Sequence, residues 1–264
     1  IQSVGVVYEF NVFGPSRPNA GGNAIKDRSV GSVVRYNRIE EGAHSIDLVE
    51  AEDFPTTAMA HPAYRSAYVY GNQIIKRGDT GSLIHYGGDH YTSKPGEKWG
   101  EPIFRKGTLY FFNNTVHVTG SQGALFNIST TEEKAEIWNN VFYFAPSVQF
   151  PSMRQASDIG KPWIAGGIVN LGRNWINGNW ADTDPYHQIP GELNGNSNLL
   201  TGTIAPISLS TLRPTSGSAV IDASQEGPAI AAAWKVEYEL DENFLPRRRE
   251  MKGAALDMGA VEAP

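Results

Sequence analysis

An Asn recurs down the first two-thirds of the chain, each time inside a run of alternating apolar residues. Successive copies are 26, 35, 42, 26 and 34 residues apart. Periods of about 20–50 residues indicate a repeat architecture. The runs are rich in Val, Ile, Tyr and Phe and alternate with a period of two, which predicts strands. The copies are centred on Asn11, Asn37, Asn72, Asn114, Asn140 and Asn174.

A second set of short strands lies between the Asn strands. Each carries an apolar residue 9 or 12 positions from a neighbouring Asn, namely Ile25, Ile46, Ile84 and Phe126. One Asn strand, one turn and one strand of this second set therefore make up each repeat. We predict an all-β parallel solenoid, in which equivalent positions of successive coils become neighbours about 4.8 Å apart.

The regularity of the pattern changes along what we predict to be a single domain, residues 1–264. Residues 1–145 carry the clearest coils, and residues 146–215, rich in Pro, Gly and Asn, predict irregular coils and long loops. Residues 216–264 are expected to form a C-terminal cap. The strand pattern starts at Ile1 without a cap of its own, so we expect N-terminal coils to be missing.

The second strand set predicts a column of polar side chains. Successive residues of a strand point to opposite faces, so the residue after each buried apolar position must face outward. Those residues are Lys26, Asp47, His85 and Asn127. A cation, a carboxylate and an imidazole in contact are suited to acid–base chemistry. Exposed strand faces are also polar by default, so an ordinary solvated surface remains the alternative interpretation.

Residues around this column supply a candidate binding surface. Arg28 lies two positions beyond Lys26, on the same strand face, and His44 precedes the strand of Asp47. Two long loops are charged and aromatic, and long loops in a regular fold are commonly functional. The predicted substrate-binding residues are His44, Tyr86, Asp89, His90, Tyr91 and Trp99.

Composition narrows the classes of function. The net charge of −6 argues against a general nucleic-acid binder. No apolar run approaches the ~20 residues of a membrane span, and the chain has no Cys. Glu50 and Asp53 are weak candidates for calcium ligands, because calcium needs about six to eight oxygens and their spacing matches no recognised loop.

Several motifs resemble those of secreted bacterial right-handed parallel β-helix proteins. The resemblance covers most of the chain and is weakest over 146–210. The ending, from Ala219 to Glu262, is similar to the terminal segment of many such proteins. The motifs are Asn23-Ala-Ile-Lys26-Asp-Arg28, Tyr36-Asn37-Arg38-Ile39, Ser45-Ile-Asp47-Leu, Tyr70-Gly-Asn72-Gln-Ile, Leu83-Ile-His85-Tyr-Gly and Asn113-Asn114-Thr115.

The superfamily implied is that of pectate lyases, alginate lyases and chondroitinase B, with the polygalacturonase-like hydrolases. In its lyases a Lys, Arg or His removes the proton next to a uronate carboxyl group, and calcium or Arg neutralises that carboxylate. The resemblance implies Lys26 as base, Arg28 as carboxylate partner and His85 as an alternative base or acid. It also implies a secreted or periplasmic enzyme whose substrate is an acidic polysaccharide or oligosaccharide, cleaved by β-elimination.

Two alternatives stay open. A glycoside hydrolase would use two carboxylates, such as Asp47 with Asp89 or Glu50, about 5–9.5 Å apart. The paired-Asp motif of the polygalacturonases is absent from the sequence, which disfavours their mode of hydrolysis. A non-catalytic solenoid would use the same column and loops only to hold a glycan or a partner.

Overall fold

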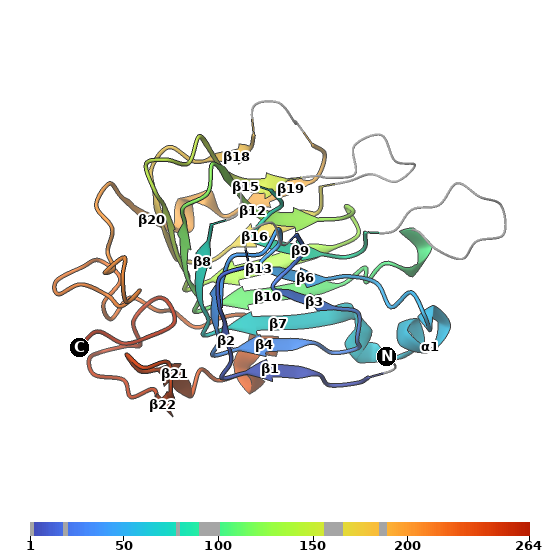
Figure 1. Ribbon diagram of the computed structural model, residues 1–264, viewed down its shortest axis with the longest axis horizontal. Coiled ribbons are helices and arrows are strands. Elements are labelled where there is room, and N and C mark those ends of the chain that lie inside the picture. Colours follow the sequence, from blue (N-terminus) through green and yellow to red (C-terminus); the bar gives the residue numbers. More distant parts are fainter. Residues whose placement is uncertain (1–2, 18–20, 78–79, 90–100, 156–165, 185–188) are drawn as a thin grey trace.

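The structure is a computed structural model that describes residues 3–17, 21–77, 80–89, 101–155, 166–184 and 189–264. Within these residues the chain forms a right-handed parallel β-helix, which confirms the predicted fold class. Each coil adds one strand to each of three parallel sheets, and the coils stack in sequence order (Figure 1).

The three sheets differ only in which strand of each coil they collect. The first contains β1 (Val7–Glu9), β4 (Val33–Arg35), β7 (Ser66–Tyr70), β10 (Thr108–Phe112), β13 (Lys134–Trp138), β16 (Ile168–Leu171) and β19 (Glu192–Asn194). The second contains β2 (Val12–Phe13), β5 (Arg38–Glu40), β8 (Gln73–Lys76), β11 (Thr115–Val118), β14 (Val141–Phe144), β17 (Asn174–Asn177) and β20 (Leu199–Gly202). The third contains β3 (Ile25–Asp27), β6 (Ile46–Leu48), β9 (Ile84–Tyr86), β12 (Gln122–Ile128), β15 (Phe150–Gln155) and β18 (Ala181–Thr183).

Few elements lie outside these sheets in the described part of the chain. Helix α1 (Pro55–Ala60) follows β6. None of the helices among the described residues is both long enough and apolar enough to cross a membrane. An antiparallel pair, β21 (Tyr238–Leu240) and β22 (Pro246–Arg248), belongs to the C-terminal segment. Short 3-10 turns cover Pro62–Arg65, Glu101–Ile103, Asn196–Asn198 and Ala229–Ala233.

The register of the third sheet is the predicted one. Ile25 pairs with Ile46, Ile46 with Ile84, and Ile84 with Phe126. All four side chains are buried in the central apolar core. The residue that follows each of them therefore points out of the solenoid, and this alternation fixes the position of the polar column.

The recurring Asn residues form a continuous ladder at the turn between the first and second sheets. The Nδ2 of Asn72 donates to the Oδ1 of Asn114 at 2.9 Å, and that of Asn114 donates to Asn140 at 3.1 Å. Each Oδ1 also accepts the backbone N–H of the Asn on the preceding coil, as Asn114 does from Asn72 at 3.0 Å. The residue before the Asn is left-handed in most coils, for example Tyr36 at φ 55°, which turns the chain from one sheet into the next.

Strands continue well beyond residue 145, into the stretch where the sequence predicts irregular coils. β14 pairs with β17, and β17 pairs with β20, which ends at Gly202. The ladder continues as well, because Asn140 donates to Asn174 at 2.8 Å. Pro-rich and Gly-rich connections separate these short strands, and they obscure the alternation in the sequence.

The segment predicted to be a cap lies along the sides of the coils (Figure 1). Trp234 stacks on Tyr68 of the first sheet, with ring centroids 4.2 Å apart. Ala260 donates its backbone N–H to the Oγ1 of Thr115, in the second sheet, at 2.9 Å. The segment thus covers outer faces of the first and second sheets and leaves the outer face of the third sheet to other residues.

Replacing one rung of the ladder should be costly in the middle of the solenoid. In Asn114→Ala, the backbone N–H and the side-chain Nδ2 of Asn72 lose their shared acceptor, the Oδ1 of Asn114. The backbone carbonyls of Val69 and Phe112 lose their donor, the Nδ2 of Asn114, and all these groups are buried. Each buried polar group left without a partner costs about 1–3 kcal/mol, so we expect the free energy of unfolding to fall by about 3 kcal/mol or more in urea titrations. Asn11→Ala, in the exposed first coil, is the control, and equal losses in both variants would contradict a structural role for the stacked amides.

Candidate functional site

The predicted polar column is present on the outer face of the third sheet. Lys26 pairs with Asp47, and Asp47 pairs with His85, across three adjacent strands. The expectation that the whole column is exposed is wrong, however. Asp47 and His85 are only 1% and 3% exposed, because residues that follow β9 and β12 pack over them. Lys26 remains accessible, with 39% of its side chain exposed.

Asp47 is the centre of the buried part. Its Oδ1 lies 3.0 Å from the Nδ1 of His85, and its Oδ2 accepts from the Nδ2 of Asn23 at 2.6 Å and pairs with the Nζ of Lys26 at 2.7 Å. Burial alone would raise the pKa of Asp47, but the hydrogen bonds and charges of His85 and Lys26 lower it far below its usual range. Asp47 is therefore an ionised carboxylate that orients the other two side chains.

His85 is held from its other side by Ser129, which follows β12. The Nε2 of His85 lies 3.0 Å from the Oγ of Ser129, and this Oγ also accepts from the backbone N–H of Gly88 at 3.0 Å. Asp47, His85 and Ser129 thus form a chain of hydrogen bonds. Ser129 is only 1% exposed, so it positions the imidazole and is not accessible as a nucleophile.

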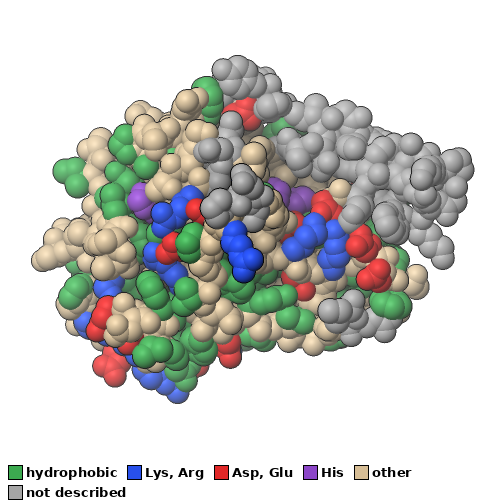
Figure 2. Space-filling model, viewed as in Figure 1, with side chains coloured by type: hydrophobic (Ala, Val, Ile, Leu, Met, Phe, Trp, Pro, Cys, Tyr) green, Lys and Arg blue, Asp and Glu red, His purple; other side chains and the backbone are tan. Residues whose placement is uncertain are grey.

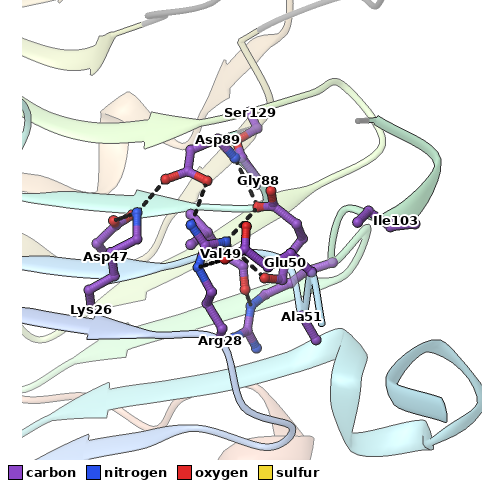
Figure 3. A network of polar contacts seen from close by, with 12 residues as sticks. Lys26, Arg28, Asp47, Val49, Glu50, Ala51, Gly88, Asp89, Ile103 and Ser129 are labelled. Carbon is purple, nitrogen blue, oxygen red and sulfur yellow. Dashed lines mark hydrogen bonds and ion pairs between the residues drawn. The ribbon is translucent and has the colours of Figure 1, made fainter. Parts of the chain in front are cut away.

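The accessible part of the site is a fork of two cations around one carboxylate (Figure 3). The Nζ of Lys26 contacts the Oδ2 of Asp89, and the Nη2 of Arg28 donates to its Oδ1 at 2.9 Å. Exposed fractions of 21% for Arg28 and 25% for Asp89 keep this fork in reach of a ligand. Lys26 lies in β3 and Arg28 directly follows this strand, and the side chains of both reach Asp89.

Charge pairing sets the protonation states of the fork. Burial lowers the pKa of Lys26, but its hydrogen bonds and ion pairs with Asp47 and Asp89 outweigh that effect and raise it. Burial raises the pKa of Asp89, and the hydrogen bonds and charges of Lys26 and Arg28 reverse this and lower it. Lys26 is therefore a cation and Asp89 an anion at neutral pH.

Two further carboxylates extend the network below the fork. The Nη1 of Arg28 lies 3.4 Å from the Oε2 of Glu50, and its Nε lies 3.5 Å from the Oε1 of Glu52. Glu50 is fully buried, and burial together with the nearby charge of Asp89 raises its pKa. On the face shown in Figure 2, Lys and Arg side chains lie beside Asp and Glu side chains, so the surface is mixed in charge.

The weak calcium candidates are not brought together into a cation site. Glu50 is engaged by Arg28, and Asp53 lies on the exposed segment before α1. Within the part of the chain that the structure describes, no group of three or more His, Asp and Glu side chains is arranged to hold a metal ion.

The other residues predicted to bind substrate lie in different places in the structure. His44 lies beside the column, with its ring centroid 5.1 Å from that of His85. Tyr86 is fully buried in the central core, because it follows His85 and the strand alternation turns it inward. His90, Tyr91 and Trp99 lie outside the described residues.

Asn23, Ser129 and Glu133 belong to the surroundings of the site but were not predicted. Ser129 lies two positions after Asn127, so the period of two that revealed the column also points to it. Glu133 comes from a turn and follows no pattern. It is fully buried, accepts the backbone N–H groups of Lys106 and Thr130, each at 3.0 Å, and burial raises its pKa to about 7.

Comparisons with protein-family models, with curated proteins and with solved structures found no match to this chain. The parallel β-helix is established by the structure itself. The resemblance to the pectate lyase superfamily comes from sequence motifs, and no family, relative or solved structure names that superfamily.

The partly buried position of His44 should make stability depend on pH. Burial and the neighbouring His85 lower the pKa of His44 from 6.5 to about 4, and its Nδ1 accepts the N–H of Ser82 at 3.1 Å. Between these pKa values the unfolded chain binds more protons, so this contribution to stability rises as pH increases from about 4 to 6.5.

His44→Asn keeps an acceptor for Ser82 but has no titrating ring. The free energy of unfolding can be measured by urea titrations at several pH values. The difference between wild type and variant should increase in favour of the wild type by up to about 3 kcal/mol as pH rises across this window. Titrating groups that do not interact with His44 are common to both proteins and cancel in the difference. Parallel pH profiles would show that His44 does not titrate as its burial implies.

Proposed function

We propose that the protein cleaves an acidic, uronate-containing polysaccharide by β-elimination on the outer face of β3, β6 and β9. One observation carries this proposal, namely the Asp89 carboxylate held between Lys26 and Arg28. A uronate carboxylate requires the same two partners, and it would take the place of Asp89 in the fork. The side chains of Lys26, Arg28 and Asp89 are all partly exposed, so a substrate carboxylate could reach the two cations although other carboxylates also pair with them.

The chemistry needs a neutralised carboxylate and a base. A proton next to a carboxylate is weakly acidic, and two cations on that carboxylate stabilise the negative charge that develops when the proton leaves. The electrons of the broken C–H bond form a C=C bond, the C–O bond to the departing sugar breaks, and its oxygen receives a proton. The product carries an unsaturated uronate at its new end.

The ion pairs favour different roles from those implied by the resemblance. Because its pKa is raised, Lys26 suits the role of carboxylate partner beside Arg28 and is poorly suited to be the base. Asp89 is the accessible ionised carboxylate of the fork, and displacement by the substrate would free it from the two cations that lower its pKa, so this scheme assigns it the role of base. Asp47 and His85 are buried and act in this scheme by holding Lys26 in position.

The geometry favours elimination over hydrolysis. Two hydrolytic carboxylates must flank the glycosidic bond, with the substrate between them. Between Asp47 and Asp89 lies the ammonium group of Lys26, which contacts both carboxylates. Glu50 has the raised pKa of a general acid, but it is fully buried beneath Arg28 and Asp89.

A non-catalytic glycan-binding solenoid is the second candidate. It is favoured by the burial of Asp47 and His85, which leaves the imidazole out of reach of a ligand. Such a protein would bind a uronate oligosaccharide saturably and release no product. Either function concerns a polymer found outside the cytoplasm, so we propose a secreted or periplasmic protein.

The elimination product absorbs ultraviolet light through its new double bond, which gives a direct assay. We expect absorbance to rise with at least one of pectin, alginate, hyaluronan, chondroitin and glucuronan, tested with and without calcium. Lys26→Ala and Arg28→Ala should each lower kcat/KM by about 100-fold or more. Lys106→Ala is the matched control, since Lys106 is likewise held by two carboxylates, Glu101 and Glu132, outside the site. Silence of the folded wild type on every polymer would refute elimination.

The Asp89→Asn variant distinguishes two roles of Asp89, namely competition with the substrate carboxylate for the two cations and removal of the proton as the base. The variant keeps the shape of the side chain but loses its charge, so a uronate oligosaccharide should bind more tightly in calorimetric titrations. If Asp89 also takes the proton, kcat should fall by about 100-fold despite the tighter binding. Weaker binding by the variant would show that Asp89 does not occupy the position of the substrate carboxylate.

A further inference from the structure

A cavity of about 190 Å³ lies directly beside the cation fork. It is open to solvent and lies between α1, the turn after β3 and the segment before β1. Its walls are mainly apolar side chains, contributed by Val4, Val30, Ala51, Phe54 and Ala58. Neither the predicted column nor the proposed elimination uses this space.

Arg28 connects the cavity to the fork. Its side chain lines the cavity and at the same time donates from Nη2 to Asp89 at 2.9 Å (Figure 3). A ligand whose carboxylate replaced that of Asp89 would therefore have an adjoining apolar space within reach. The rest of its polar edge includes Glu52 and Asp53, so a second anionic group is repelled there.

His61, which lines the cavity, offers a hydrogen-bond donor in its neutral form. The Nδ1 of His61 accepts the backbone N–H of Ala63 at 3.2 Å, so in the neutral ring the proton is on Nε2. His61 is one of the residues that line the cavity, so Nε2 is the ring nitrogen left to donate to an ester or ether oxygen of a ligand. Pockets for whole drug-sized ligands measure about 300–1,000 Å³, so a cavity of this size suits one substituent.

We propose that this cavity binds an uncharged, apolar, ring-sized substituent carried by the acidic ligand, such as an aromatic acyl ester on the glycan. The position of the ligand's carboxylate rests on the proposed function, whereas the apolar cavity does not. Its walls favour an apolar group, its acidic edge excludes a second anion, and Arg28 ties it to the carboxylate site.

The test uses three small probes titrated into the full chain and followed by nuclear magnetic resonance. Benzyl alcohol probes the cavity alone, acetate probes the fork alone, and 3-phenylpropionate probes both together. Thr57→Trp places a large side chain at the cavity, which Thr57 lines. Thr56→Trp is the matched control, because Thr56 is equally exposed on α1 but does not line the cavity.

We expect the wild type and Thr56→Trp to bind benzyl alcohol, and to bind 3-phenylpropionate at least about tenfold more tightly than acetate. Thr57→Trp should lose both properties. Lys26→Ala removes one cation of the fork but does not alter the lining of the cavity, so it should weaken acetate binding while sparing benzyl alcohol. Equal binding of benzyl alcohol by the two Trp variants, or no binding by the wild type, would overturn the cavity assignment. Equal affinity of the wild type for the two acids would overturn its link to the fork. Failure of the elimination assay alone leaves the benzyl alcohol result standing and refutes only the proposed function.

Discussion

The stacked Asn amides are the constraint on which the rest of the structure depends. Each amide bonds to the Asn of the next coil and to carbonyls of its own and the preceding coil, so neighbouring turns cannot slip by a residue. A slip of one residue would exchange the inner and outer faces of every strand. The ladder thus keeps Ile46 inside and Asp47 outside, and it aligns Asp47 with its neighbours on the adjacent coils.

The polar face of the third sheet shows how pairing controls charge in a buried setting. Removal of a charge from water is costly unless opposite charges and hydrogen bonds replace the solvent. Asp47 has such partners and stays ionised, whereas Glu50, equally buried and close to Asp89, has a raised pKa. The pKa values of two buried carboxyl groups a few residues apart are therefore shifted in opposite directions, because their partners differ.

Strand periodicity made the fold and the polar column predictable from the sequence. A period of two and a recurring Asn are local patterns, and they were enough to place Lys26, Asp47 and His85 on adjacent strands. The burial of Asp47 and His85 was not predictable from the sequence. It depends on which residues of the connections between strands pack over the column, and Ser129 is such a residue for His85. The inward direction of Tyr86 follows from the same alternation and could have been predicted, whereas the cavity beside Arg28 depends on the packing of a helix that no repeat encodes.

The ladder has a consequence for how such a protein can change over time. Its rungs stay in contact although the chain between successive Asn residues varies from 26 to 42 residues. The connection that carries α1 lies between β6 and β7, so its length and composition can drift while the strands that hold Lys26 and Asp47 keep their register. The sequence around α1 can therefore change without disturbing the stacking of the coils, because the ladder and not this connection sets the position of the charged face.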